Sequence, residues 1–239
     1  MNYTIHHVKS IDSTNTFLKE LAKQGAPEGY VLVADEQTGG RGRLGRNFFS
    51  PSGGLYASIL VRPSFALSPA VFTCMTAVAV SDTISSFGET CSIKWVNDIY
   101  CRNGKAGGIL VEGAVTPAGL YEYVVIGIGL NLSMPSTIPS DLRNIITSVF
   151  DNETDAAFRD SFLQGFLISF HRYYETLPSI SFWKKYCDLQ NCYGRKVSFT
   201  QDGRTYTGIA ESIDNEFRLI VRAGSSLFSL ERGEVNFLL

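Results

Sequence analysis

Apolar and polar positions along the chain of 239 residues follow two periods, which predict helices and strands. Apolar residues take up helical spacing after Ser13 and again after the pair Ser68–Pro69, and both starts carry residues that favour the first turn of a helix. Apolar runs bounded by Gly, Pro and Asn predict strands between these helices. We therefore predict helices over 13–23, 69–87 and 158–174, and strands over 31–34, 55–61, 92–96, 99–102, 107–114 and 121–132.

The pattern changes after about residue 191, where short alternating runs predict strands over 196–199, 205–213, 217–221 and 227–230. Strands this short and this evenly spaced are typical of a small β-barrel. The sequence thus predicts an α+β fold with two domains. Residues 1–190 hold a mixed or antiparallel sheet with helices packed on it, and residues 191–239 hold the barrel.

Composition limits the partners and the location. The chain is 44% hydrophobic and 18% charged with a formal net charge of −2, which suits a globular protein and argues against one that coats nucleic acid. It shows no N-terminal leader pattern and no run of ~18 apolar residues, so we expect a cytoplasmic protein with no membrane partner. Five cysteines without a C-x-x-C pair favour reduced thiols, and three scattered histidines offer no transition-metal site.

The segment 39–46, called the Gly/Arg loop below, is the most informative stretch, because it places three arginines among four glycines. Glycine lets a ligand approach the backbone and arginine pairs with phosphate or carboxylate, so we expect a small anionic ligand here. The segment also fits the dinucleotide fingerprint G-x-G-x-x-G. That fingerprint must open a helix, and residues 47–54, with Pro51 and two glycines, exclude one. A solvated, flexible turn is the alternative.

Two further segments place charged groups where apolar strands are expected. Lys94 lies in the predicted strand 92–96 and Asn97 and Asp98 follow it, and burying such groups requires partners. Asp98 is the natural contact for Mg²⁺, while a hairpin turn at Asn97–Asp98 is the alternative. Lys105 enters the next strand through two glycines, which lets the ammonium and the backbone both approach a ligand.

Gly127 and Gly129 alternate with aliphatic residues up to Asn131, so one face of that strand carries no side chain. A flat ligand on the sheet needs such a face, and so does close packing of a helix. Both alternatives stay open. The sequence contains no evident Ser/His/Asp or Cys/His set for nucleophilic catalysis.

Taken together and in this order, these segments resemble the biotin protein ligases, from Ser13 to the end of the chain, most specifically at 40–46, 94–100 and 105–112. The resemblance implies a catalytic domain like that of class II synthetases and an SH3-like C-terminal barrel. It implies an ATP-dependent reaction in which biotin's carboxylate attacks the α-phosphate, giving biotinyl-5′-AMP and pyrophosphate. In that reaction the biotin then passes to a lysine of a biotin carboxyl carrier protein.

The resemblance also assigns roles to individual residues. It implies that biotin contacts Ser13, Thr14, Asn15, Gln37, Arg41, Gly42, Arg43, Lys105 and Gly108. It implies that ATP or the adenylate contacts Arg43, Arg46, Phe48, Asn97, Asp98, Lys105 and Asn131, with Asp98 also holding Mg²⁺ beside the phosphates. Because two anions meet in this reaction, the expected catalytic residues are those suited to neutralising charge, namely Arg41, Arg43 and Lys105.

Two positions depart from the family pattern. Phe48 stands where a tryptophan is frequent, and its smaller ring still offers a stacking surface for adenine. Val96 replaces the proline of the Lys-Trp-Pro-Asn-Asp segment, which affects the rigidity of the turn more than its chemistry.

Some members of that family carry an N-terminal DNA-binding domain, and the signature beginning at Ser13 leaves no room for its ~60 residues. We therefore expect a single-function ligase with no nucleic-acid partner, as a monomer or weak homodimer. A lipoate–protein ligase is the nearest enzymatic alternative, because it shares the fold and the adenylate chemistry. A non-catalytic sensor that holds biotinyl-adenylate is the alternative from another class.

Overall fold

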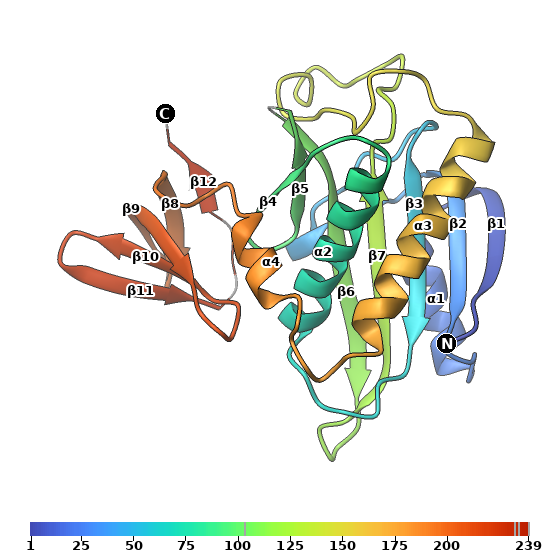
Figure 1. Ribbon diagram of the computed structural model, residues 1–239, viewed down its shortest axis with the longest axis horizontal. Helices are drawn as coiled ribbons and strands as arrows, with labels where there is room; N and C mark the ends of the chain where they lie inside the picture. The colour runs from blue at the N-terminus through green and yellow to red at the C-terminus, as the bar shows by residue number, and fades with distance from the viewer. Residues whose placement is uncertain (103, 232, 234, 239) are drawn as a thin grey trace.

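A seven-stranded sheet forms the larger part of the structure, a computed structural model that describes residues 1–102, 104–231, 233 and 235–238 (Figure 1). The bounds are β1 Thr4–Ile11, β2 Tyr30–Gln37, β3 Leu55–Val61, β4 Ser92–Lys94, β5 Asp98–Cys101, β6 Gly104–Val115 and β7 Tyr121–Leu130. The strands lie in the order β1-β2-β3-β7-β6-β5-β4. Among the described residues β1 pairs parallel to β2 and the other neighbours pair antiparallel, which confirms the expected mixed sheet.

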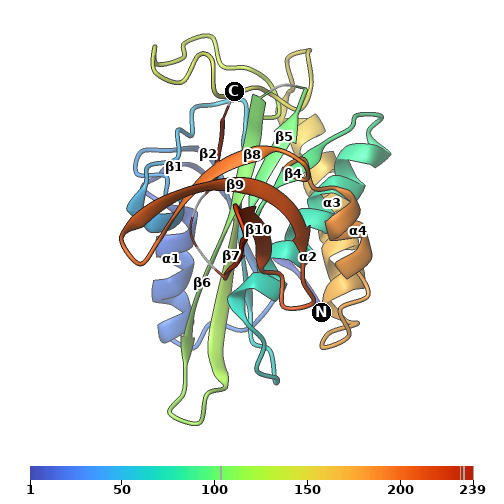
Figure 2. The same ribbon diagram turned by 90° about the vertical axis from the view of Figure 1, so that its left-hand side faces the viewer.

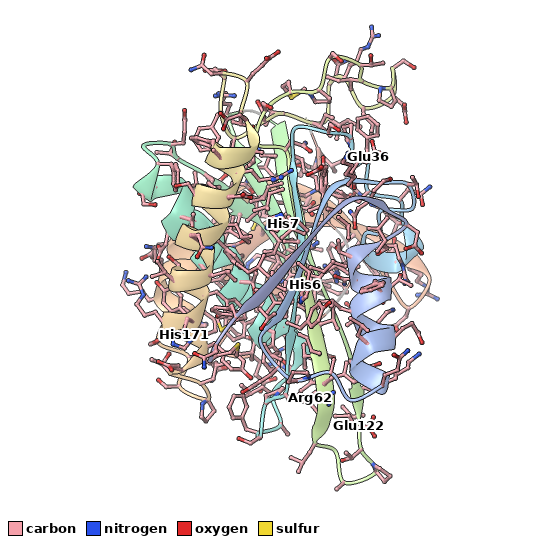
Figure 3. The ribbon with its side chains drawn as sticks, turned by 90° about the vertical axis from the view of Figure 1, so that its right-hand side faces the viewer. His6, His7, Glu36, Arg62, Glu122 and His171 are labelled. Atoms are coloured by element: carbon pink, nitrogen blue, oxygen red, sulfur yellow. The ribbon has the colours of Figure 1, made fainter. Side chains whose placement is uncertain are left out.

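Helices cover both faces of this sheet, as Figure 3 shows from the β1 edge. Their bounds are α1 Thr14–Lys23, α2 Pro69–Ser86, α3 Ala156–Tyr174 and α4 Trp183–Asp188. On one face, Leu18 of α1 is buried against Leu32 of the sheet. Arg62 at the end of β3 donates to Ala22 O at 2.8 Å and to Glu122 O at 2.7 Å, so the C-terminal end of α1 is tied to the sheet. The three long helices predicted from apolar spacing are present.

α2 is buried on almost all sides, whereas its spacing predicted one apolar face. Thirteen of its 18 residues are buried, because it lies between the sheet and α3. Thr76 fits inside by donating its hydroxyl to Phe72 O at 2.7 Å. The aromatic residues Phe162, Phe166 and Phe170 of α3 are buried, which confirms that this stripe belongs to the core.

The C-terminal residues form a second, antiparallel sheet that is strongly curved and barrel-like (Figure 2). Its bounds are β8 Lys196–Gln201, β9 Arg204–Ile213, β10 Leu219–Ala223, β11 Ser226–Leu230 and β12 Val235–Phe237, in the order β11-β10-β9-β8-β12. It packs against the larger part beside β4, where Trp95 Nε1 donates to Phe217 O at 2.9 Å and the rings of Phe217 and Phe182 stack. The domain boundary between residues 190 and 191 stays a prediction.

Three elements were not predicted. β1 is an edge strand in which Ile5, Val8 and Ile11 recur at every third residue, a spacing that fits neither period. α4 and β12 contain six and three residues, too few to show a period.

All five cysteines are free, and three of them, Cys74, Cys101 and Cys192, are buried. Burial raises the pKa of Cys101 to about 12 and that of Cys192 to about 11, so both thiols are protonated at neutral pH. Within the described ranges, no helix has the length and apolar character needed to cross a membrane.

Candidate active site

A cavity lies where the start of α1, the Gly/Arg loop and strands β5, β6 and β7 come together. The space inside it is about 930 Å³ when the open solvent at its mouth is included. Nearly all residues that the sequence assigned to the site line this cavity. They are Ser13, Thr14, Asn15, Gln37, Arg41, Gly42, Arg43, Arg46, Phe48, Asn97, Asp98, Lys105 and Gly108.

The lining is strongly cationic, although the whole chain has a formal net charge of −2. Among the described residues, it holds five basic side chains and one carboxylate, that of Asp98. A cleft with one dominant sign of charge attracts ligands of the opposite sign, so this cavity favours phosphate or carboxylate groups. The basic residues are Arg41, Arg43, Arg46, Lys94 and Lys105.

The start of α1 is fixed by side-chain hydrogen bonds. Ser13 Oγ caps the helix by accepting from Thr16 N at 3.4 Å. At the end of β2, Gln37 Oε1 accepts from Thr14 N at 2.9 Å, and Gln37 Nε2 donates to Ser50 Oγ at 3.0 Å. Since both ends of the Gln37 amide are bonded, the polar wall beside α1 has one defined orientation.

Two residues of this wall were not predicted. Ser58, buried in the middle of β3, lies 2.7 Å from Thr14 Oγ1 and 2.6 Å from Asn15 Oδ1. Glu112 on β6 accepts hydrogen bonds from Asn15 and Lys19. The available signal was the same for both, because each interrupts a predicted apolar strand with a polar group.

Two polar pairs connect the segments of the site. Lys105 Nζ lies 2.7 Å from Asp98 Oδ1, an ion pair between β6 and β5. Arg43 Nη1 donates to Asn97 Oδ1 at 3.0 Å, which ties the Gly/Arg loop to the turn between β4 and β5. Asn97 Nδ2 donates to Ile109 O at 3.1 Å. The hairpin turn takes residues 95–97, so the turn alternative is correct for Asn97 and wrong for Asp98, which begins β5, and both side chains line the cavity.

The Gly/Arg loop folds back on itself without opening an α-helix, which confirms that the dinucleotide fingerprint does not apply. Gly42 N donates to Arg46 O at 2.7 Å across a single 3₁₀ turn at Arg43–Gly45. Within this turn Leu44 has φ 56°, a left-handed conformation that is unusual for leucine. Gly42 has φ −112°, which any residue adopts, so backbone conformation does not explain its missing side chain.

The glycines of β6 and β7 have different surroundings. A Cβ atom on Gly127 would lie 2.1 Å from Asn15 Oδ1, and one on Gly129 would lie 2.5 Å from the Phe48 ring. Asn15 of α1 therefore packs over Gly127, as the helix-packing alternative has it, and the Phe48 ring lies over Gly129, while both glycines also line the cavity. Gly108 also lines the cavity, but a Cβ there would meet nothing closer than 3.5 Å. The open part of the sheet face is at Gly108.

Asn131 lies outside the lining. It is buried, and its Nδ2 donates to Thr147 O at 3.0 Å, in the segment that follows β7. Its backbone N–H donates to Ala106 O at 2.7 Å. The expected contact between Asn131 and the adenylate stays a prediction without support from this geometry.

Among the described residues that line the cavity, Asp98 carries the one carboxylate that could contact a magnesium ion. Asp98 Oδ1 pairs with Lys105, and the described part of the chain holds no cluster of three or more His, Cys, Asp or Glu residues that could bind a metal. Mg²⁺ is commonly bound by one or two carboxylates together with substrate phosphates. Asp98 therefore fits an ion that arrives with a nucleotide better than an ion held by the protein alone.

The C-terminal domain borders the cavity, which the sequence did not predict. Gly233, between β11 and β12, is part of the lining. The ring of Phe237 lies 5.1 Å from Lys94 Nζ and 4.7 Å from the Arg195 guanidinium carbon. The buried Lys94 is therefore enclosed between the two domains.

These features define a class of site. Fixed cations and oriented amides surround the cavity, and its described lining includes no cysteine or histidine to act as a nucleophile or general base. Such groups bring anionic substrates together and stabilise the charge that develops between them. The cavity is therefore of the class that suits an enzyme acting on anionic substrates.

Comparisons with known proteins agree with this class. The sequence model of the biotin/lipoate A/B protein ligase family matches residues 7–131. The bifunctional ligase/repressor BirA of Bacillus subtilis is 31% identical over 235 residues, which cover 94% of this chain and 71% of that protein. The biotin–[acetyl-CoA-carboxylase] ligase of Paracoccus denitrificans is 29% identical, and the match covers 95% of this chain and 97% of that protein.

The fold comparison leads to the same family. The biotin protein ligase from Aquifex aeolicus, solved in complex with biotin and ATP, superposes with a TM-score of 0.83 at 25% identity and covers 98% of both chains. The present chain belongs to the biotin/lipoate A/B protein ligase family, and is a protein ligase.

Proposed function

We propose that the protein is an ATP-dependent biotin protein ligase, which forms biotinyl-5′-AMP and then transfers biotin to a lysine of a biotin carboxyl carrier protein. The observation that carries the proposal is the cavity, whose described lining brings five basic side chains, one carboxylate and all the residues assigned to biotin and ATP except Asn131 together. Family membership supports it, as does the likeness to a ligase solved with biotin and ATP.

In the proposed first step, the carboxylate of biotin attacks the α-phosphorus of ATP and pyrophosphate leaves. Two anions must approach each other, so fixed cations lower the barrier. Arg41, Arg43 and Lys105 are assigned this role. Arg43 is held by Asn97 and Lys105 by Asp98, so two of the charges are in place before the substrates bind.

The polar wall at α1 is assigned to biotin. Thr14, Asn15 and Gln37 present hydroxyl and amide groups with fixed orientation, which suits the donors and acceptors of the ureido ring. Gly108 leaves the sheet face open beside them, and we assign this space to the acyl chain. The Phe48 ring, which also lines the cavity, is assigned to the adenine.

Mg²⁺ bound with ATP would neutralise the phosphates further, and Asp98 is the carboxylate assigned to hold it. In the second step, the amine of the carrier lysine attacks the carbonyl carbon of the mixed anhydride, and AMP leaves with the electrons of the broken C–O bond. No enzyme nucleophile is needed for this step. The Gly/Arg loop is assigned the task of shielding the adenylate from water.

Two alanine variants test the assignment. Lys105→Ala and Arg43→Ala are each expected to lower biotin-dependent ATP–pyrophosphate exchange by about tenfold or more, since each removes a charged contact of roughly 1.5–3 kcal/mol. Their melting temperatures are expected to stay close to the wild-type value, so the loss of exchange would not reflect unfolding. Arg204→Ala, on the exposed start of β9, is the matched control. Wild-type exchange in either cavity variant would remove that residue from the catalytic set.

Turnover separates the ligase from the sensor. Purified protein with biotin, ATP and a biotin carboxyl carrier domain is expected to biotinylate many carrier molecules per protein molecule. Stoichiometric retention of biotinyl-5′-AMP without biotinylated carrier would contradict the proposal and favour a non-catalytic sensor.

A further inference from the structure

Glu112 of β6 binds side chains from two other segments without lining the cavity itself. Its Oε2 accepts from Asn15 Nδ2 at 3.0 Å, and its Oε1 accepts from Lys19 Nζ at 2.5 Å. Arg41 Nη1 of the Gly/Arg loop lies 3.6 Å from the same Oε1 and 3.4 Å from Thr16 Oγ1. One carboxylate therefore links α1 to the loop.

This carboxylate, together with Leu110 O, fixes which way the Asn15 amide faces. An ionised carboxylate only accepts hydrogen bonds, so it takes the NH₂ end of the amide, and Leu110 O also accepts from that nitrogen at 3.2 Å. The amide oxygen is then left to face Ser58 Oγ at 2.6 Å, over the bare face of Gly127. A glutamine at position 112 offers both a donor and an acceptor, so it would not impose this orientation.

The charge of Glu112 also orients Arg41. Burial alone would raise the pKa of Glu112, but hydrogen bonds from Lys19 and Asn15 and the charges of Lys19 and Arg41 bring the pKa below its ordinary value. Lys19 makes the short contact at 2.5 Å and Arg41 the longer one at 3.6 Å. Two positive charges and one negative charge leave a net charge of +1, so Arg41 is oriented and still attracts an anion.

We propose that Glu112 is a positioning residue for the acyl substrate, because it holds the Asn15 amide and the Arg41 guanidinium in the arrangement that binds that substrate. The inference rests on the proposed function and on the assignment of both Asn15 and Arg41 to contacts with biotin. Glu112 acts through these two side chains and contacts no substrate. Its loss therefore affects the biotin site and spares the nucleotide site.

The test is steady-state ATP–pyrophosphate exchange by the full-length protein, with biotin and ATP varied separately. Glu112→Gln keeps the size of the side chain and removes its charge. The KM for biotin is expected to rise about tenfold, as for the loss of one charged hydrogen-bond partner, and the KM for ATP is expected to stay within about twofold. Glu112→Asp keeps the acceptor-only character and is expected to fall between wild type and Glu112→Gln.

Glu211→Gln is the matched control, because Glu211 forms a similar ion pair with Arg222 within the C-terminal sheet. A purely structural role for Glu112 would lower the melting temperature of its variants and leave the KM for biotin at the wild-type value. Lys19→Gln keeps Glu112 in place and removes its closest partner, so a smaller rise in the KM for biotin is expected.

The outcomes distinguish this inference from the proposed function. Wild-type protein without any biotin-dependent exchange would contradict the proposed function. Biotin-dependent exchange in wild type, with an unchanged KM for biotin in Glu112→Gln, would overturn the role of Glu112 and leave the function standing. If Glu112→Gln does not fold, Glu112→Asp and Lys19→Gln decide, and unchanged KM values for biotin in both would overturn the inference.

Discussion

Gly107 and Gly108 are neighbours on β6 and face opposite sides of the sheet, so alanine at each position tests a different property. A Cβ on Gly107 would lie 2.3 Å from Gly129 O, whereas one on Gly108 would meet nothing closer than 3.5 Å. Gly107→Ala is expected to lower the melting temperature by roughly 2–12 °C, because overpacking costs about 1–3 kcal/mol. Gly108→Ala is expected to keep the melting temperature and raise the KM for biotin, because its methyl group enters the cavity.

Thermal unfolding and exchange kinetics of the two purified variants check this pair. An unchanged KM for biotin in Gly108→Ala would show that no ligand approaches this part of the sheet. A wild-type melting temperature in Gly107→Ala would contradict the close packing between β6 and β7.

Site residues could be predicted where a charged residue or a glycine stands in or beside an apolar strand. Arg41, Arg43 and Lys105 stood out because charge and glycine occur together beside strands, and all three line the cavity. Glu112 was not assigned, because a single acid in a strand usually faces water and its partners on α1 and the loop are distant in sequence. Asn131 was assigned to the site and does not line the cavity. Its side chain instead donates a hydrogen bond to the segment that follows β7, which a polar residue at the end of a glycine-rich strand can do as well.

The turn between β4 and β5 is held by an element that is distant in the sequence and lies beside it in the fold. Tyr186 of α4 is fully buried and donates its hydroxyl to Val96 O at 3.0 Å, while Asn97 of the same turn binds Arg43. Tyr186→Phe leaves a buried backbone oxygen without its partner, so we expect a loss of about 1–3 kcal/mol in the free energy of unfolding. We also expect a several-fold lower kcat for exchange, because Asn97 loses its support.

Tyr121→Phe is the control for this prediction. Tyr121 donates to Leu67 O at 2.8 Å, a bond of the same type that does not involve a residue of the cavity lining. Urea unfolding is expected to show a loss of stability in both variants, and kcat is expected to fall in Tyr186→Phe alone. Equal kcat values in the two variants would mean that α4 does not act on the site.

Helices and strands were predicted correctly where the apolar spacing repeats over enough residues, and were missed where it does not. α1, α2 and α3 are long enough to repeat their apolar spacing, and the spacing located all three. α4 has six residues and is held through the buried Tyr186, a contact that no local period encodes. β1 gains its strand geometry by pairing with β2, so its own sequence of mixed polar and apolar residues gave no clear signal.

The distribution of charge over the molecule predicts a salt dependence. The described lining of the cavity carries five basic groups and one acid, which sum to +4, whereas the whole chain has a formal net charge of −2. Raising the salt from about 0.1 M to about 1 M shortens the Debye length from ~10 to ~3 Å. The KM for ATP is therefore expected to rise by about threefold or more. Sucrose at equal osmolality is the control, and an equal KM at both salt concentrations would contradict a role for this field.

The relation between the two domains could not be predicted, although the barrel itself was. Phe237 lies over Lys94, and Gly233 joins the lining, through contacts between positions far apart in the sequence. Alternating patterns locate strands and say nothing about what a finished barrel packs against. The enclosure of Lys94 is thus a property of the whole molecule.

ATP–pyrophosphate exchange by the purified wild-type protein, with biotin or lipoate as the acid, tests whether the protein activates biotin. Exchange reports the reversible formation of an acyl-adenylate and needs no carrier protein. We expect exchange that depends on biotin and is not stimulated by lipoate. Exchange stimulated by lipoate alone, or by neither acid, would contradict the assignment as a biotin protein ligase.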